Sequence, residues 1–148
     1  MIDEQMMEYA LTYARKAEGH TGDNPAVGCI ITYNDKVLSV GHTLAPGEGH
    51  AEANAIQRAL QTGIPLDECT LYVTLEPCAF DGRSLACASL ITQHRLKRVV
   101  VGMVDPHPKV NGKGVEMIEQ AGIDVRVGVL ESAIKDQLYH WILHCQGL

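Results

Sequence analysis

Apolar residues recur along this chain at two spacings, one typical of helices and one typical of strands. Near the N-terminus they repeat every three or four positions, as on one face of a helix. Further on, short apolar runs are bounded by Gly, Pro and Asn, as strands are. The pattern predicts helices from Asp3 to about Gly19 and at residues 50–60, 84–94, 115–120 and 131–144, and strands at residues 27–33, 37–40, 70–75, 98–104 and 123–127.

The order of these elements predicts the fold. Residues 34–36 read Asn-Asp-Lys between the first two strands, so we expect a hairpin there. The strand at 98–104 is apolar on both faces, which indicates helices on both sides of the sheet. We therefore expect an α/β fold, a three-layer α/β/α sandwich with a mixed five-stranded sheet. Sites in such sheets lie at the carboxyl ends of strands, which points to the loops at 47–52, 76–87 and 105–114.

Length and charge narrow the class of protein. The chain has 148 residues, 46% of them hydrophobic and 20% charged, which suits one globular domain. Its net charge of −6 argues against nucleic acid as a partner, because that needs a basic face. Charged residues near the N-terminus argue against a secretory signal, and no apolar run is long enough for a membrane. We expect a cytoplasmic protein whose five cysteines are reduced or bind metal.

Three residues with metal-ligating side chains stand in two of these loops. His50 opens a predicted helix, Cys78 follows a predicted strand, and Cys87 comes after eight intervening residues. One imidazole and two thiolates leave the fourth tetrahedral position of a zinc ion for water, as in catalytic zinc sites. A structural site would need a fourth protein ligand, for which Cys69 and His94 are only loosely placed. The spacing therefore predicts a catalytic Zn²⁺ site.

Glu52 lies two residues after His50, at the start of the same predicted helix. Positions i and i+2 of a helix point in different directions, so we do not expect both residues to bind the metal. Beside the metal, Glu52 can move protons from the zinc-bound water to a ring nitrogen and then to the leaving amine. An H-x-E motif with a later P-C and a second cysteine is typical of zinc deaminases. Glu52 is therefore the predicted catalytic residue.

Further motifs accompany this set. The chain carries NPAVGC at 24–29, GH at 41–42, TLEPC at 74–78, GR at 82–83, DPHPKVNGKG at 105–114 and AGIDVRVGVLE at 121–131. With them it resembles the zinc-dependent cytidine and deoxycytidylate deaminase superfamily, and within it the deaminase domain of the bifunctional riboflavin-biosynthesis deaminase/reductase. The resemblance runs from about residue 24 to residue 131. It implies a cytidine-deaminase-like fold and a homodimer or higher homo-oligomer, for which the closing helix is a candidate contact.

The resemblance also implies a substrate and the residues that bind it. Members of this family remove an amino group from diaminohydroxyphosphoribosylaminopyrimidine, a phosphorylated small molecule of riboflavin biosynthesis. The resemblance puts Asn24 against the pyrimidine and His42 in the pocket wall. It puts Arg83 on the phosphate, a role that suits a guanidinium fork, and Asp105 and His107 at the ribose phosphate end.

The chain departs from the family pattern at several positions. The family usually has His at the position of Phe80 and Thr-Pro-Pro at residues 84–86, and it often has Asn at the position of His107. Phe80 and His107 fall where contact with the sugar phosphate is expected, so the polar groups there have changed. We expect residues 1–148 to form a single zinc-dependent deaminase domain without the reductase domain of the bifunctional family members.

Other functions stay open at this point. A paralogous nucleoside or nucleobase deaminase, of the cytosine, guanine or adenine type, would not need Arg83, so Arg83→Ala would leave its affinity unchanged. A tRNA-adenosine deaminase is disfavoured by the acidic balance and by the long spacing between Cys78 and Cys87. A non-catalytic, zinc-stabilised binding module needs no acid beside its metal, so Glu52→Gln would leave its function intact.

Glu76 in the TLEPC motif and two histidines outside the motifs have alternative interpretations. Glu76 could be a second acid, although a role in fixing the backbone of its turn is favoured. His140 and His144 lie four apart on one predicted helix and could bind a metal, although packing or a subunit contact is favoured. Cys145 has no ligand spacing.

Overall fold

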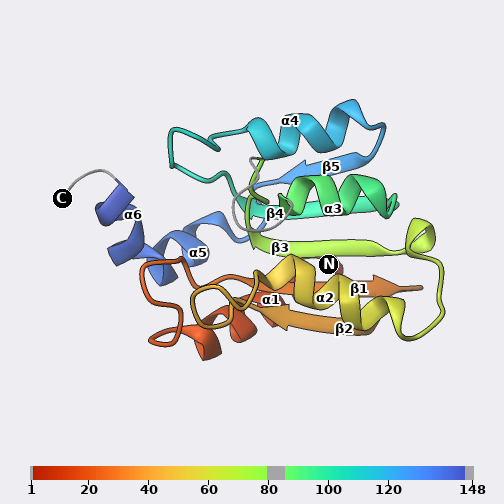
Figure 1. Cartoon of the computed structure of the whole chain (residues 1–148), viewed down its shortest axis with the longest axis horizontal. Helices are drawn as coiled ribbons and strands as arrows, with labels where there is room; N and C mark the ends of the chain where they lie inside the picture. Colours follow the sequence, from red (N-terminus) through yellow and green to blue (C-terminus); the bar gives the residue numbers. More distant parts are fainter. Residues whose placement is uncertain (1, 80–85, 146–148) are drawn as a thin grey trace.

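A computed structural model describes residues 2–79 and 86–145, and it shows a central sheet between helices (Figure 1). The predicted roles of Phe80, Arg83 and Ser84 lie outside the described residues. The elements in chain order are α1 (Ile2–Ala17), β1 (Gly28–Tyr33), β2 (Lys36–His42), α2 (Ala51–Leu60), the 3₁₀ turn η1 (Leu66–Glu68), β3 (Thr70–Leu75), α3 (Cys87–Gln93), β4 (Arg98–Met103), α4 (Lys113–Gln120), β5 (Asp124–Val127), α5 (Glu131–Gln137) and α6 (Tyr139–Cys145).

The sheet has five strands in the order β2-β1-β3-β4-β5. β1 pairs antiparallel with β2 and with β3, whereas β3, β4 and β5 run parallel. The hairpin between β1 and β2 turns at Asn34 and Asp35, whose φ angles of 51° and 62° are those of a type I′ turn. Both the mixed five-stranded sheet and the hairpin are as predicted.

Helices cover both faces of the sheet, and two glycines in neighbouring strands allow the close approach. A Cβ atom on Gly28 would collide with the carbonyl oxygen of Ala10 in α1. A Cβ atom on Gly41 would collide with the carbonyl oxygen of Ala51 in α2. Gly41 pairs with Cys29, the neighbour of Gly28, so the two glycines face opposite sides. α1 therefore covers one face and α2 the other, which confirms the three-layer sandwich.

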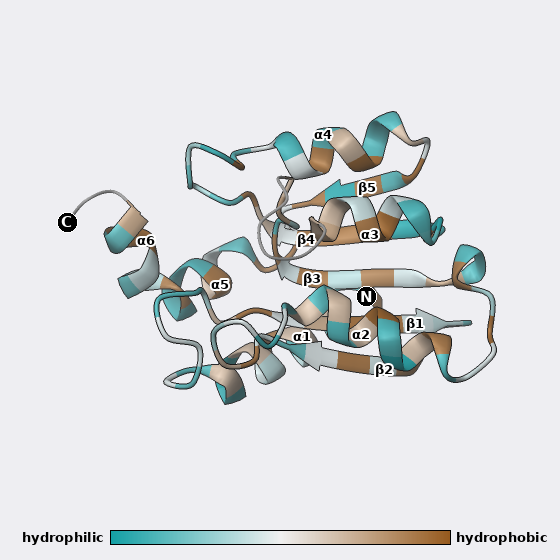
Figure 2. Ribbon diagram, viewed as in Figure 1, coloured by the Kyte–Doolittle hydropathy of each residue, from teal (hydrophilic) through white to brown (hydrophobic). Residues whose placement is uncertain are grey.

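The core lies where the central strands meet both helix layers. Val99, Val100 and Val101 of β4 are all fully buried, as the predicted strand with two apolar faces requires. Figure 2 shows apolar residues in brown along β3 and β4 and polar residues in teal on the outer turns of the helices. None of the helices in the described residues is long and apolar enough to cross a membrane.

The first helix begins at Ile2, one residue before the predicted start at Asp3, so Asp3 lies within the helix and is not its N-cap. Its carboxylate instead points onto the sheet, where it accepts hydrogen bonds from Arg98 at 2.9 and 2.8 Å, from Arg126 at 2.6 Å and from the Tyr72 hydroxyl at 3.1 Å. The hydrogen bond from Arg98 is the main reason that the pKa of Asp3 lies far below its usual range. This cluster ties α1 to three strands.

The single closing helix predicted at 131–144 is two helices. α5 ends at Gln137, and α6 starts at Tyr139. Leu138 between them is only 3% exposed, whereas α6 has no buried residue. We infer that the chain bends here because the core ends at Leu138, so that α6 lies outside the core.

Candidate active site

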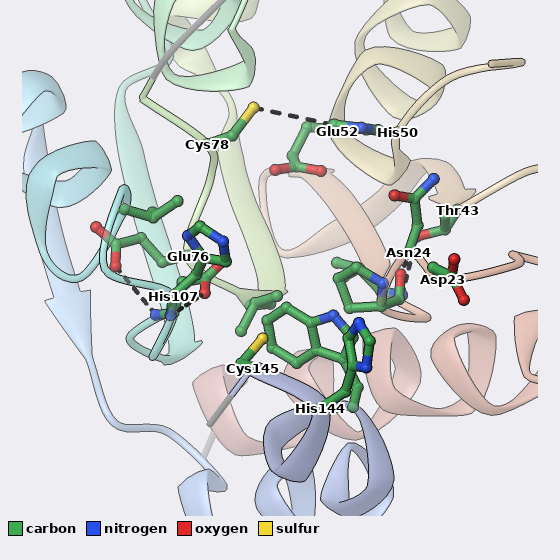
Figure 3. A pocket seen from close by; sticks show the side chains of 16 residues that line it. Asp23, Asn24, Thr43, His50, Glu52, Glu76, Cys78, His107, His144 and Cys145 are labelled. Atoms are coloured by element: carbon green, nitrogen blue, oxygen red, sulfur yellow. Dashed lines mark hydrogen bonds between the residues drawn. The ribbon is translucent and has the colours of Figure 1, made fainter. Parts of the chain in front are cut away.

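Four chain segments bring the predicted metal ligands and acids to one place, at the carboxyl ends of the parallel strands. The chain leaves β3 just before Cys78 and leaves β4 just before Asp105. It enters α2 at His50, which is the N-cap, and it enters α3 at Cys87. Figure 3 shows Cys78, His50 and Glu52 close together on one side of a cavity. The position agrees with the site predicted at the strand ends.

His50, Cys78 and Cys87 form a cluster whose dimensions suit zinc. The Nδ1 atom of His50 lies 3.4 Å from the Cys87 Sγ and 3.9 Å from the Cys78 Sγ, and all three ligand atoms lie within 4.8 Å of one another. Zinc–sulfur bonds of about 2.3 Å and a zinc–nitrogen bond of about 2.0 Å at a tetrahedral centre separate nitrogen from sulfur by roughly 3.5 Å. In residues 2–79 and 86–145 no fourth His, Cys, Asp or Glu joins the cluster, and a structural site is therefore not supported.

The two cysteines of the cluster differ in their protonation. The Cys78 Sγ accepts the backbone N–H of Cys87 over 3.2 Å. A hydrogen bond from the Cys87 side chain, together with contacts to His50, lowers the pKa of Cys78 to about 4. The same pairing and burial raise the pKa of Cys87 well above its usual value. Without metal the site thus holds one thiolate and one thiol, and metal binding must release the second proton.

Glu52 is a buried acid beside this cluster. It stands in the first turn of α2, its exposed fraction is 4%, and it lines the cavity. Burial, followed by the nearby Cys78 thiolate, raises the pKa of Glu52 to about 7. Among the ion pairs of the described residues, none involves Glu52. A buried carboxyl with no ion pair costs stability, and such groups cluster at functional sites.

The cavity beside the cluster has a volume of about 420 Å³. Six of the residues predicted for the site or its metal line it, namely Asn24, His50, Glu52, Cys78, Asp105 and His107. The others are Asp23, Pro25, Val27, Thr43, Leu75, Glu76, Val110, Trp141, His144 and Cys145.

Asn24 reaches the cavity from a braced segment between α1 and β1. The Thr43 Oγ1 accepts the backbone N–H of Val27 at 3.0 Å and donates to the Pro25 carbonyl at 3.1 Å. The Thr21 hydroxyl donates to the Asn24 carbonyl at 2.6 Å. These bonds fix the backbone, while the Asn24 side chain is exposed at the cavity.

Of the predicted site residues, Cys87 belongs to the metal cluster without lining the cavity, and His42 and Arg83 join neither group in the part of the chain that the structure describes. His42 ends β2, its Nδ1 lies 3.1 Å from the Thr43 carbonyl oxygen, and it is not among the residues that line the cavity. The expected place in the pocket wall is therefore not seen, because the ring turns toward the adjacent backbone. Arg83 and the neighbouring departure at Phe80 lie outside the described residues. Contact of either residue with a substrate stays a prediction.

Glu76 holds the loop between β4 and α4 in place. Glu76 is only 3% exposed, and its carboxylate accepts three backbone N–H groups. Oε1 accepts from Asp105 at 3.1 Å and from Gly112 at 2.8 Å, and Oε2 accepts from Val115 at 3.0 Å. The turn-fixing role favoured from the sequence is thus correct in kind, although the backbone that Glu76 fixes lies 29 to 39 positions away.

The loop held by Glu76 carries Asp105 and His107. Burial is the main reason that the pKa of Asp105 is raised. The Asp105 Oδ1 accepts the backbone N–H of His107 at 2.8 Å. The His107 Nδ1 accepts the backbone N–H of Lys109 at 3.2 Å, which leaves the ring proton on Nε2. His107 therefore offers an N–H donor.

Three residues of α6 form a wall that the sequence did not reveal. Trp141, His144 and Cys145 all line the cavity. Figure 3 shows His144 and Cys145 on the opposite side of the cavity from Cys78 and His50. Spacings of three and four residues put the three side chains on one helix face, which is a signal the sequence contains. The sequence could not show that this face meets the cavity, because that depends on the bend at Leu138.

The sequence profile of one protein family matches most of the chain. It is described as the cytidine and deoxycytidylate deaminase zinc-binding region, and it matches residues 1–103. A riboflavin biosynthesis protein RibD from Aquifex aeolicus is 42% identical over 91% of this chain. The chain spans only 37% of the length of that relative. A diaminohydroxyphosphoribosylamino-pyrimidine deaminase from Buchnera aphidicola is 38% identical over 88% of this chain, and here the match covers 86% of the relative.

Solved structures share the fold. The crystal structure of a diaminohydroxyphosphoribosylaminopyrimidine deaminase/reductase from Thermotoga maritima superposes with a TM-score of 0.92 at 35% identity. The superposition covers 99% of this chain and 42% of that one.

Proposed function

Because the chain belongs to the cytidine and deoxycytidylate deaminase zinc-binding family, we propose that it hydrolytically deaminates diaminohydroxyphosphoribosylaminopyrimidine, as the riboflavin branch of that family does. The observation that carries the reaction class is the buried Glu52 beside the His50, Cys78 and Cys87 cluster. The substrate assignment is supported by the Buchnera relative, which bears this activity in its name and aligns over most of its length.

The matching family is described as zinc-binding, and the three clustered donors fit a zinc ion in type and spacing. When bound by His50, Cys78 and Cys87, the ion supplies a Lewis acid that lowers the pKa of a water molecule to about 7 and so provides a nucleophile at neutral pH. The low pKa of Cys78 prepares one thiolate for this role before the metal arrives.

Glu52 moves the protons in this proposal. One carboxylate oxygen of Glu52 takes a proton from the attacking water and passes it to the ring nitrogen next to the amine-bearing carbon. The second proton of the water goes by the same carboxylate to the amino group, the carbon–nitrogen bond breaks, and ammonia leaves as the carbonyl forms. A pKa near 7 lets Glu52 both accept and donate near neutral pH.

Asn24 and His107 orient the substrate in this proposal. The Asn24 amide offers a donor and an acceptor to the edge of a pyrimidine, and its backbone is held through Thr21 and Thr43. The Nε2–H of His107 offers a donor to the sugar phosphate. The Glu76 carboxylate keeps the loop of His107 in position.

A non-catalytic binding module is disfavoured by Glu52. A zinc site that only stabilises a fold gains nothing from a buried acid without an ion pair, and burying that acid costs free energy. A single deaminase domain over residues 1–148 and a homo-oligomeric state both stay predictions, and light scattering tests the second.

Release of ammonia by the zinc-loaded protein tests the substrate assignment. The phosphorylated diaminopyrimidine would be compared with cytidine, guanine and adenine at equal concentration, with apoprotein as the control. We expect rapid release from the diaminopyrimidine alone. Release from one of the other three compounds, or none from protein that carries about one zinc per chain, would contradict the assignment.

A further inference from the structure

Helix α2, which begins directly after His50, packs on strand β2 (Figure 1). The Ser39 hydroxyl of β2 donates to the Ala55 carbonyl of α2 at 2.8 Å. The Arg58 guanidinium of α2 donates to the Val40 carbonyl of β2 at 3.1 Å. Both bonds meet α2 more than one turn after its start. They therefore hold the body of the helix rather than the metal ligand that precedes it.

The start of α2 lacks the usual side-chain cap. An N-cap side chain commonly accepts an N–H group of the first turn. The ring of His50 makes no such hydrogen bond within the described residues, and its Nδ1 faces the thiols of Cys78 and Cys87 instead. The preceding residue is Gly49, whose φ of 125° is one that glycine adopts readily and other residues rarely do. Because glycine is so permissive, the backbone of His50 needs another constraint.

The side chain of Asn54, in α2, supplies this constraint. Its Nδ2 donates to the His50 carbonyl at 2.9 Å and to the His42 carbonyl at 3.3 Å. An amide NH₂ group has two protons to donate, so one side chain can make both bonds. The His50 carbonyl also accepts the backbone N–H of Asn54 at 3.2 Å. The amide thus joins the backbone of the metal ligand to the end of β2, across the loop of residues 43–49.

We propose that Asn54 is a positioning residue for the metal site, which acts through the His50 backbone and holds the imidazole beside the two thiols. Cys78 and Cys87 are already tied together, because the Cys78 Sγ accepts the Cys87 N–H at 3.2 Å and the Cys78 carbonyl accepts the Ala88 N–H at 3.0 Å. His50 comes from a separate segment, so the dimensions of the cluster depend on how that segment is held. This inference rests on the zinc site of the proposed function and not on its substrate.

Zinc affinity tests the role of Asn54. Asn54→Ala keeps a good helix former in α2 and removes both hydrogen bonds of the amide. Loss of a group that orients a metal ligand typically costs roughly 10- to 100-fold in metal affinity. Because Asn54 contacts the backbone of His50 and not its ring, we expect the lower end of this range. The zinc dissociation constant, measured by competition with a chromophoric chelator at pH 7, should rise about tenfold.

Ser39→Ala is the matched control, because it also removes a hydrogen bond between β2 and α2, but one that ends at Ala55. Its zinc dissociation constant should stay within about twofold of that of the unaltered protein. Zinc would be titrated into apoproteins that circular dichroism shows to be folded, so that lower stability alone does not change the constant. Equal zinc affinities for Asn54→Ala and Ser39→Ala would overturn the inference, because Asn54 would then support only the fold.

Asn54→Leu provides a second variant, since leucine keeps the shape of the asparagine side chain, adds no charge and has no N–H group to donate. Its zinc affinity should fall as far as that of Asn54→Ala. Zinc binding by Asn54→Leu as tight as that of the unaltered protein would also overturn the inference. These titrations need no substrate, so an unaltered protein that holds zinc but releases no ammonia would refute the proposed function and leave the role of Asn54 standing.

Discussion

Replacing Glu76 with glutamine should loosen the loop that carries Asp105 and His107. The carboxylate accepts N–H groups from Asp105 and Gly112 at Oε1 and from Val115 at Oε2, at 2.8 to 3.1 Å. Glutamine keeps the shape and one acceptor but converts one oxygen into an NH₂ group. A donor then faces a donor in a site that is 3% exposed. Either Val115 or the pair Asp105 and Gly112 loses its acceptor.

The magnitude follows from these bonds. A hydrogen bond to a charged group contributes about 1.5–3 kcal/mol, and a buried donor without a partner costs about 1–3 kcal/mol. Glu76→Gln should therefore lower the free energy of unfolding by about 3 kcal/mol, measured by urea denaturation at pH 7. The exposed Glu119 of α4 provides the matched control, since Glu119→Gln makes the same charge change and should stay within about 0.5 kcal/mol.

The same variant should also weaken substrate binding, since Asp105 and His107 line the cavity on the loop that Glu76 holds. KM should rise several-fold for the folded variant at a temperature well below its transition. A loss below about 1 kcal/mol together with an unchanged KM would refute the role of Glu76 in holding this loop.

Three further changes test other parts of the structure. Asp3→Asn should lower the free energy of unfolding by about 2 kcal/mol at pH 7. Because the pKa of Asp3 is lower in the folded than in the unfolded protein, this stabilisation is present above the unfolded pKa and shrinks as the pH falls below about 4. Urea denaturation at several pH values measures both effects. Gly114→Ala should cost 2 kcal/mol or more in the same assay, because its Cβ would collide with the Pro77 carbonyl oxygen, whereas Gly63→Ala meets no neighbouring atom and should cost about 1 kcal/mol for its positive φ. Cys87→Ala should lower bound zinc below about a tenth of one equivalent by metal analysis, whereas Cys69→Ala, outside the cluster, should keep about one.

The metal cluster and the central fold could be predicted because their signals are local. His50 and Glu52 stand two residues apart at a helix start, and Cys78 and Cys87 each stand where a loop follows a strand or precedes a helix. Their side-chain types alone restrict the metal and its geometry. β3 was predicted at its observed bounds, because an apolar run between turn residues has few other interpretations.

The rest depends on contacts between distant segments. Glu76 looks like a turn residue until the chain closes and its carboxylate meets N–H groups of residues 105–115. Asp3 looks like a helix cap, because nothing near it in sequence shows that Arg98 and Arg126 lie beneath it.

The bend at Leu138 could not be predicted from the sequence, because residues 131–145 contain no Gly or Pro that would mark it. Helical hydrogen bonding also continues on both sides of Leu138. The Leu138 N–H bonds to the Ile134 carbonyl, and the Leu138 carbonyl accepts from Ile142, both at 2.9 Å. The apolar spacing therefore reads as one helix. The two helices are separated at Leu138, whose backbone leaves the helical conformation at φ −97° and ψ 12° and whose side chain is buried, whereas α6 has no buried residue.

The most direct test of the central claim is the rate of ammonia release by Glu52→Gln at matched zinc content. The substitution keeps the size of the side chain, leaves the cluster of His50, Cys78 and Cys87 intact and removes the group that moves protons. If Glu52 acts as proposed, kcat falls at least about a hundredfold while about one zinc stays bound per chain. A variant that keeps both its zinc and its rate would contradict proton transfer by Glu52 and would favour a site that uses the metal alone.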